Sequence, residues 1–262
     1  MSELPPLVDA AWLQERLGEG DVLVGDVRGP NAHQRGHVPG SIPLVLGSPP
    51  PLATRATVEE FAIEVQRRLG RHGVTGDERL VLYDRGDCVG AAASAQAALA
   101  AGHPRVSVLA GGIGGWPGEL DQGPAELQKT KVSLEPNLDA VPTWEELRGR
   151  LDDPGLTILD VRSDDEYRGR GGYPCDPRQG HLPGSRHLEV ERLFARPGRP
   201  HEPWGIRELT GLPEGAAIVA YCHSGSRSAL AALALRAAGY DARNYPGSWH
   251  EWSRHEELPA ER

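Results

Sequence analysis

The residues with the clearest chemical potential form one short loop, Cys222-His223-Ser224-Gly225-Ser226-Arg227. An apolar stretch precedes the loop and an alanine-rich stretch follows it, which predicts a strand, a tight turn and a helix beginning near Ser226. The reactive form of cysteine is the thiolate, and backbone N–H groups gathered at a helix N-terminus stabilise negative charge. The turn is built from small residues, and Arg227 adds a permanent positive charge. The loop therefore predicts a nucleophile, Cys222, in an anion-stabilising cradle, against the alternative of an ordinary buried cysteine at a strand end.

The chain has only three cysteines, Cys88, Cys175 and Cys222. A low, odd count gives no disulfide framework, so we expect reduced thiols and a cytoplasmic protein. The N-terminus has neither the basic nor the apolar region of a signal peptide, and no apolar run has transmembrane length. We expect Cys88 to be a small packed residue. For Cys175 two alternatives stay open, an inert loop thiol and a redox partner of Cys222.

The overall charge limits the classes of partner. The 262 residues carry a formal net charge of −9, which argues against nucleic acid and against an anionic membrane. A small anionic substrate must then be held by a local arrangement of arginine side chains and backbone N–H groups.

The sequence repeats itself, which indicates tandem duplication. Three short motifs occur in the same order in both halves: residues 26–28 and 160–162 read Asp-Val-Arg, residues 36–41 and 180–185 share Gly-His-x-Pro-Gly-Ser, and residues 80–84 match 218–222 in pattern. The second half carries ten more residues than the first between the first two motifs. The repeat places Asp84 at the position of Cys222.

Alternating apolar strands and helices predict an α/β fold with parallel sheets covered on both faces. In the first half we expect strands at 22–24, 79–83 and 106–109, a helix opened by a capping box at Thr57 and ending near Gly70, and a helix at 89–101. In the second half we expect a capping box at Thr143, strands at 156–159, 216–221 and 242–245, and a helix at 226–238. The expected division is a first domain at 1–120, a linker at 121–141 and a second domain at 142–262.

These motifs resemble the rhodanese family. The loop is similar to the family's Cys-x-x-Gly-x-Arg/Thr active-site loop, and both halves carry its Asp-Val-Arg and Gly-His-x-Pro-Gly patterns. The resemblance covers nearly the whole chain and implies two tandem rhodanese-like domains, each a parallel five-stranded sheet flanked by helices. It also implies one active site, because Asp84 cannot accept sulfur, and a first domain that walls one side of the catalytic cleft.

The resemblance implies a sulfurtransferase that moves sulfane sulfur from thiosulfate to cyanide or a thiol through a Cys222 persulfide, without metal or cofactor. Ping-pong kinetics are then expected. A 3-mercaptopyruvate donor and a persulfide carrier that does not turn over small donors remain as alternatives. A related phosphatase would need Cys-x5-Arg, whereas Arg227 follows Cys222 after four residues. We expect a monomer that binds neither nucleic acid nor membrane.

The substrate-binding residues expected beside Cys222 are His223, Ser224, Gly225, Ser226, Arg227 and Arg168. Arg168 would bind the anionic end of the donor, although a solvated surface role is the alternative. His223 is expected to point outward and to shape access of the acceptor.

Three further residues are expected to have structural roles. Arg162 is expected to pair with Glu166, four residues on. His37 and His181 occupy the same Gly-His-x-Pro-Gly frame, His37 in the first half and His181 in the second. Because the first half has no nucleophile, this shared frame favours a structural role for both.

Overall fold

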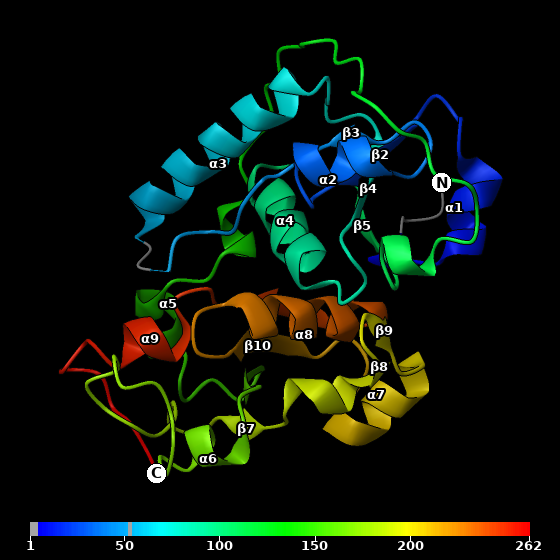
Figure 1. Ribbon diagram of the computed structural model, residues 1–262. Coiled ribbons are helices and arrows are strands. Elements are labelled where there is room, and N and C mark those ends of the chain that lie inside the picture. The colour runs from blue at the N-terminus through cyan, green and yellow to red at the C-terminus, as the bar shows by residue number, and fades with distance from the viewer. Residues whose placement is uncertain (1–4, 52–53) are drawn as a thin grey trace. The chain divides into compact units, whose positions relative to one another are not determined.

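In the computed structural model, which describes residues 5–51 and 54–262, the chain divides into two units that follow the sequence repeat (Figure 1). The first unit holds most of the chain up to Leu138 and the second most of the chain from Asp139, apart from two short exchanged segments, 49–58 and Arg196–Arg199. Each unit is an α/β structure with its own parallel sheet, as predicted.

The first unit contains a five-stranded parallel sheet in the order β1-β5-β4-β2-β3. Its strands are β1 (Leu7–Val8), β2 (Val22–Asp26), β3 (Ile42–Pro43), β4 (Arg79–Tyr83) and β5 (Val106–Leu109). Its helices are α1 (Ala10–Arg16), α2 (Pro30–Arg35), α3 (Arg55–Arg71), α4 (Val89–Ala100) and the 3-10 turn η1 (Ile113–Gly115).

The second unit contains a parallel sheet in the order β11-β10-β6-β7. These strands are β6 (Leu156–Asp160), β7 (Arg186–His187), β10 (Ala217–Tyr221) and β11 (Asp241–Asn244). The helices are α5 (Trp144–Arg148), α6 (Asp164–Tyr167), α7 (Pro203–Thr210), α8 (Ser226–Ala237) and α9 (Ser248–Trp252), with 3-10 turns η2 (Leu138–Ala140) and η3 (Val190–Leu193). Strands β8 (Phe194–Arg196) and β9 (Arg199–Pro200) form a separate pair.

The expectation of five strands in each sheet therefore holds for the first unit, whereas the described part of the second sheet has four. The difference lies at the edge where the first unit has β1. Asp9 is the N-cap of α1, and Thr143 is the N-cap of the equivalent helix α5. The two halves can therefore be aligned at this edge by matching these two residues. This alignment puts Pro142 in the place of Val8, and proline has no backbone N–H to donate to a neighbouring strand.

Buried side chains cover both faces of the second sheet. Leu159, Ile218 and Ala220 pack on one face with apolar residues of α7 and α8. Ile158 and Val219 pack on the other face with residues of α5 and α9, among them Trp249 and Trp252, which are fully buried. Alternate residues of a strand point to opposite faces, which accounts for the unbroken apolar runs of β6 and β10.

The segment predicted as a linker packs along the first unit. The backbone N–H of Thr130 bonds the carbonyl of Gly70 at the end of α3, at 2.8 Å, and the N–H of Asn137 bonds the carbonyl of Ala100 in α4, at 3.0 Å. The side chain of Gln66 donates to the carbonyl of Leu134 at 2.8 Å. These bonds satisfy backbone groups at the C-terminal ends of two helices.

The two expected capping boxes have different outcomes. At α5, Thr143 and Glu146 form the box as predicted. Helix α3 instead begins at Arg55, and Thr54 exchanges hydrogen bonds with Thr57 one turn later. A capping box at Thr57 predicts a helix beginning at Val58, so the predicted start is wrong by three residues. No helix in the described residues is long and apolar enough to cross a membrane.

Candidate active site

Strand β10 delivers Cys222 to the carboxyl edge of the second sheet, where parallel sheets bind ligands. The Cys222 Sγ atom is buried and accepts two hydrogen bonds, from the Gly225 N–H at 3.2 Å and from the Ser228 hydroxyl at 3.3 Å. Helix α8 begins at Ser226, so its N-terminal N–H groups lie in the same loop. The loop is thus built to hold negative charge at the sulfur.

Packing around the loop fixes its conformation. Gly225 has φ +90°, and a Cβ there would lie 2.9 Å from backbone atoms of Pro246. The Asn244 side chain donates to the Gly225 carbonyl at 3.0 Å. On the other side, the Ser248 hydroxyl accepts the Cys222 N–H at 3.0 Å and is 3.9 Å from the sulfur. Glycine is required at this turn because of both its left-handed backbone and its close neighbour.

The corresponding loop of the first unit directs its N–H groups at a carboxyl group. Its first residue, Asp84, is buried, and its carboxylate accepts backbone N–H bonds from Gly86, Cys88 and Ala91 at 2.9, 3.1 and 3.2 Å. Burial raises the pKa of Asp84, and these N–H bonds act in the opposite direction. Both halves therefore direct hydrogen-bond donors at this one position, which carries a carboxylate in one half and a thiol in the other.

Arg227 pairs with Glu166, the carboxylate that was expected to pair with Arg162. Its guanidinium binds Glu166 through two hydrogen bonds of 2.8 Å. Burial raises the pKa of Glu166, but the bonds and charge of Arg227 outweigh that effect and lower it to about 2. The positive charge of Arg227 is consequently balanced within the protein.

The Asp-Val-Arg motifs make the same contacts in both halves. Arg162 pairs with Asp160 at 2.6 Å and donates to the carbonyl of Gly180 at 2.7 Å, so the predicted pairing with Glu166 is wrong. Arg28 likewise binds Asp26 and the carbonyl of Gly36, each at 2.6 Å. Each arginine thus ties the end of a central strand to the Gly-His-x-Pro-Gly frame. Arg162 is buried and Arg28 half-buried, and each is paired with an aspartate, so these arginines have a structural role.

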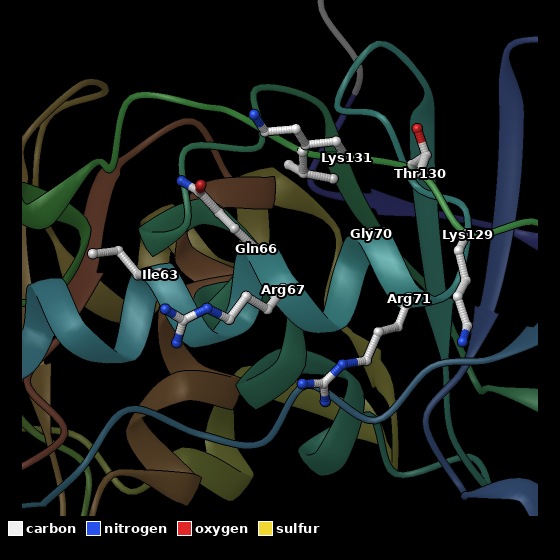
Figure 2. Close-up of a pocket in the computed structure, with 9 residues that line it drawn as sticks. Ile63, Gln66, Arg67, Gly70, Arg71, Lys129, Thr130 and Lys131 are labelled. Carbon is white, nitrogen blue, oxygen red and sulfur yellow. The ribbon is translucent and has the colours of Figure 1, made fainter.

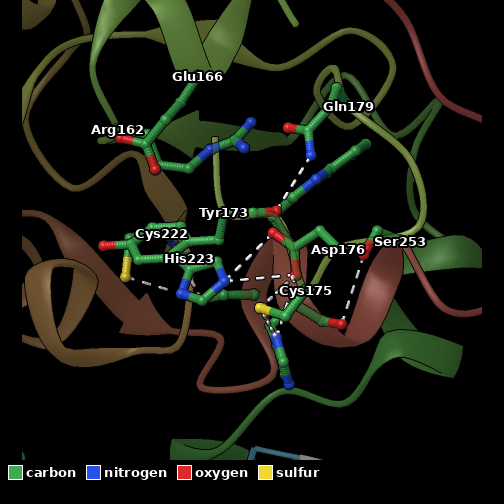
Figure 3. Close-up of polar contacts among 12 residues, drawn as sticks. Arg162, Glu166, Tyr173, Cys175, Asp176, Gln179, Cys222, His223 and Ser253 are labelled. Carbon is green, nitrogen blue, oxygen red and sulfur yellow. Dashed lines mark hydrogen bonds and ion pairs between the residues drawn. The ribbon is translucent and has the colours of Figure 1, made fainter. Parts of the chain in front are cut away.

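The His223 side chain does not point outward as expected. It is 13% exposed, stacks on the ring of Tyr173 at 3.6 Å between centroids, and places Nε2 3.2 Å from Asp176 (Figure 3). Burial lowers the pKa of His223, and the Asp176 carboxylate partly offsets the change. Both partners lie between Arg162 and Gly180, where the second half carries ten more residues than the first. The additional stretch there is called the extra segment.

The remaining sequence candidates, Arg168, His37 and His181, lie in two different settings. Arg168 is 58% exposed on its side chain and pairs with Asp164 at 2.7 Å, a solvated contact near the end of α6. His37 and His181 each use Nδ1 to contact a backbone carbonyl at 2.8 Å, of His33 and Tyr167 respectively. The geometry agrees with a structural role for both histidines.

The two other cysteines differ in environment. Cys88 is buried at the start of α4, as predicted, and burial raises the pKa of its thiol to about 12. Cys175 is exposed, and its Sγ lies 4.0 Å from His250 Nδ1. All three cysteines are free thiols.

A groove of about 440 Å³ lies in the first unit, between α3 and residues 129–132 (Figure 2). Four basic side chains line it, Arg67, Arg71, Lys129 and Lys131. It contains no residue of the Cys222 loop, so it is separate from the candidate active site.

Sequence reasoning missed three residues around the loop, Asp176, Ser228 and Ser248, and gave Glu166 the wrong partner. Ser228 lies two positions into α8, where a helix N-terminal side chain can reach back toward the loop, and this position was the available signal. Ser248 begins α9, a segment outside the three repeated motifs. Asp176 lies in the extra segment, which has no counterpart to compare.

Comparison with known proteins agrees with the fold. Residues 9–119 and 143–255 each match the Rhodanese-like domain. A relative from Mycobacterium tuberculosis, named putative thiosulfate sulfurtransferase SseB, is 30% identical, with 94% of this chain and 93% of the relative covered. A Pseudomonas aeruginosa relative, named probable 3-mercaptopyruvate sulfurtransferase, is also 30% identical, with 94% of each chain covered.

A solved structure titled as a probable thiosulfate sulfurtransferase superposes with a TM-score of 0.76 at 32% identity, covering 93% of this chain and 98% of that one. Two parallel-sheet units, in one of which β10 leads to a cysteine whose sulfur accepts the Gly225 N–H, define a tandem α/β protein. The chain belongs to the rhodanese family, and its relatives are sulfurtransferases.

Proposed function

We propose that this protein transfers sulfane sulfur from thiosulfate to a thiophilic acceptor, cyanide or a thiol, through a persulfide on Cys222. The observation that carries the proposal is the pair of hydrogen bonds that the Gly225 N–H and the Ser228 hydroxyl donate to the Cys222 sulfur. A sulfur that accepts donors in this way is set up for the anionic form, which is the nucleophile.

The proposed reaction is a double displacement. The Cys222 thiolate attacks the outer sulfur of thiosulfate, a sulfur–sulfur bond forms, and sulfite leaves with the electron pair of the broken bond. The persulfide that results is also an anion. An acceptor nucleophile then attacks its outer sulfur, and the Cys222 thiolate leaves with the electron pair of the second broken bond.

The loop residues take separate roles in this proposal. The outer sulfur of the persulfide would lie about 2 Å from Sγ, within the cradle formed by Ser224, Gly225 and the start of α8 at Ser226. Arg227 braces the loop through Glu166. We leave Arg168 out of the proposed site, because its guanidinium is engaged with Asp164 at the surface.

The first domain, which we place at 1–120, is proposed to be a catalytically inactive scaffold, since Asp84 fills its cradle with a carboxylate. The catalytic domain is proposed at 142–262, joined through residues 121–141. We further propose that the protein works in the cytoplasm on small anionic donors.

The identity of the sulfur donor is the most specific part of the proposal. Relatives named for thiosulfate and for 3-mercaptopyruvate have the same identity to this chain. The loop carries Arg227, and a cation at that place favours a dianion such as thiosulfate. Glu166 balances that charge, which favours the second candidate, 3-mercaptopyruvate, a monoanion whose recognition needs less positive charge.

Intact-mass measurement after incubation with thiosulfate tests the proposal. The chain is expected to gain one sulfur atom that cyanide removes. Cys222→Ser is expected to gain none, while Cys175→Ser, the matched control for an exposed thiol, keeps the gain. No gain with thiosulfate together with a gain from 3-mercaptopyruvate would assign the second donor. No gain from either would refute sulfur transfer through Cys222.

A further inference from the structure

Four potential metal ligands from three separate segments lie close together beside the active-site loop (Figure 3). They are Cys175 and Asp176 of the extra segment, His223 of the loop and His250 of α9, and their ligand atoms all lie within 4.8 Å of one another. The His223 imidazole reaches the cluster because it turns toward Asp176. The cluster thus shares His223 with the proposed catalytic loop but does not include the Cys222 sulfur.

The spacing of the donor atoms fits a tetrahedral ion. Around Zn²⁺, with bonds of about 2.0 Å to nitrogen and oxygen and about 2.3 Å to sulfur, neighbouring ligand atoms lie about 3.3 Å apart, or about 3.5 Å where one is sulfur. The Asp176 carboxylate is 3.2 Å from His223 Nε2 and 3.1 Å from His250 Nδ1. The Cys175 sulfur is 3.8 Å from Asp176 and 4.0 Å from His250, so a small inward movement of an exposed side chain completes the set.

We propose that Cys175, Asp176, His223 and His250 form a zinc site. The donor set of one thiolate, one carboxylate and two imidazoles suits this ion, and the thiolate and carboxylate neutralise its charge. On binding, the Cys175 thiol releases its proton to solvent. Two of the ligands lie in the stretch where the second half carries ten more residues than the first, and no second cluster of this kind occurs within residues 5–51 and 54–262.

Arg254 currently provides the positive charge at the cluster. Its Nη1 atom lies 3.3 Å from Asp176 and 3.0 Å from His250 Nδ1, and its Nη2 donates to the Cys175 carbonyl at 2.8 Å. The side chain is 33% exposed, so it can swing into solvent when an ion enters. Arg254 therefore competes with the metal, and its removal is expected to tighten binding.

The experiment measures zinc binding to the full-length chain in a Cys222→Ser background, which removes the other reactive thiol of the second unit. Isothermal titration with zinc chloride is expected to show one ion per chain. Cys175→Ser and His250→Gln are each expected to weaken binding at least about tenfold. His201→Gln removes an exposed histidine of the same unit as a matched control and is expected to leave the affinity unchanged.

Cobalt provides an independent readout. With Co²⁺ the protein is expected to show the intense ligand-field bands of a tetrahedral site and a thiolate charge-transfer band that Cys175→Ser abolishes. Arg254→Ala is expected to increase the affinity, an outcome that misfolding cannot produce. Absence of bound zinc at a small molar excess, or an affinity that Cys175→Ser and His250→Gln both leave unchanged, would overturn the proposal.

Discussion

Removing the ion pair between Glu166 of α6 and Arg227 of the active-site loop has a calculable effect on stability. Glu166→Gln keeps the size of the side chain but removes the charge that balances Arg227. The pKa of Glu166 falls from an ordinary 4.5 to about 2, a change that corresponds to about 3 kcal/mol of preference for the charged form. Because the Arg227 side chain is 30% exposed, water screens part of the attraction, and we expect about 2 kcal/mol.

The pH dependence has a definite sign. A carboxyl group with a lowered folded-state pKa stabilises the protein fully above its unfolded-state pKa and loses that contribution as the pH falls through the folded-state value. The stability difference between the native chain and Glu166→Gln should therefore be complete at neutral pH. It should shrink between about pH 4.5 and about pH 2.

Urea unfolding of a double-mutant cycle isolates the pair. The cycle compares the native chain, Glu166→Gln, Arg227→Gln and the double variant, and the coupling free energy is expected to be about 2 kcal/mol at pH 7. Asp164→Asn, an exposed carboxylate of the same helix, is the control and should change the free energy of unfolding by less than about 0.5 kcal/mol. A coupling below about 0.5 kcal/mol at pH 7 would refute the reasoning.

Three further predictions concern the two loops. Ser228→Ala removes a donor to the Cys222 sulfur, so alkylation of Cys222 by iodoacetamide at neutral pH should slow by about two- to tenfold; an unchanged rate would mean that the bond does not stabilise the thiolate. Gly225→Ala forces a Cβ to 2.9 Å from Pro246 at φ +90°, and thermal unfolding should show a loss of about 1–3 kcal/mol; equal stability would contradict the crowding. Asp84→Ala leaves three backbone N–H groups without their acceptor, so calorimetry should show a loss of about 1–3 kcal/mol, whereas Asp84→Asn should retain part of it.

The sequence was sufficient for the tandem α/β architecture because its signals are local. The apolar runs of β6 and β10 and the alanine-rich stretch of α8 specify strands and a helix without reference to distant residues. The repeated motifs then related one half to the other. The missing edge strand of the second sheet was not foreseen, because the repeated motifs do not include the position of Val8, where the second half has Pro142.

The contacts of the site were predicted less well, because they join residues far apart in the chain. Glu166 is four positions from Arg162, a spacing that suggested a local pair, yet Arg162 is bound by Asp160 and Glu166 meets Arg227 across the fold. His223 was expected to point outward, but the extra segment supplies Tyr173 and Asp176 to hold it inward. A segment present in one half only has no repeat from which its contacts can be inferred.

The most direct test of the account measures how much sulfur Cys222 carries. The full-length protein is loaded with thiosulfate, freed of small molecules and treated with cyanide, and the thiocyanate released is quantified against protein. The account predicts one thiocyanate per chain from the native protein and from Cys88→Ser, and none from Cys222→Ser. Thiocyanate release from Cys222→Ser at the native level would contradict it.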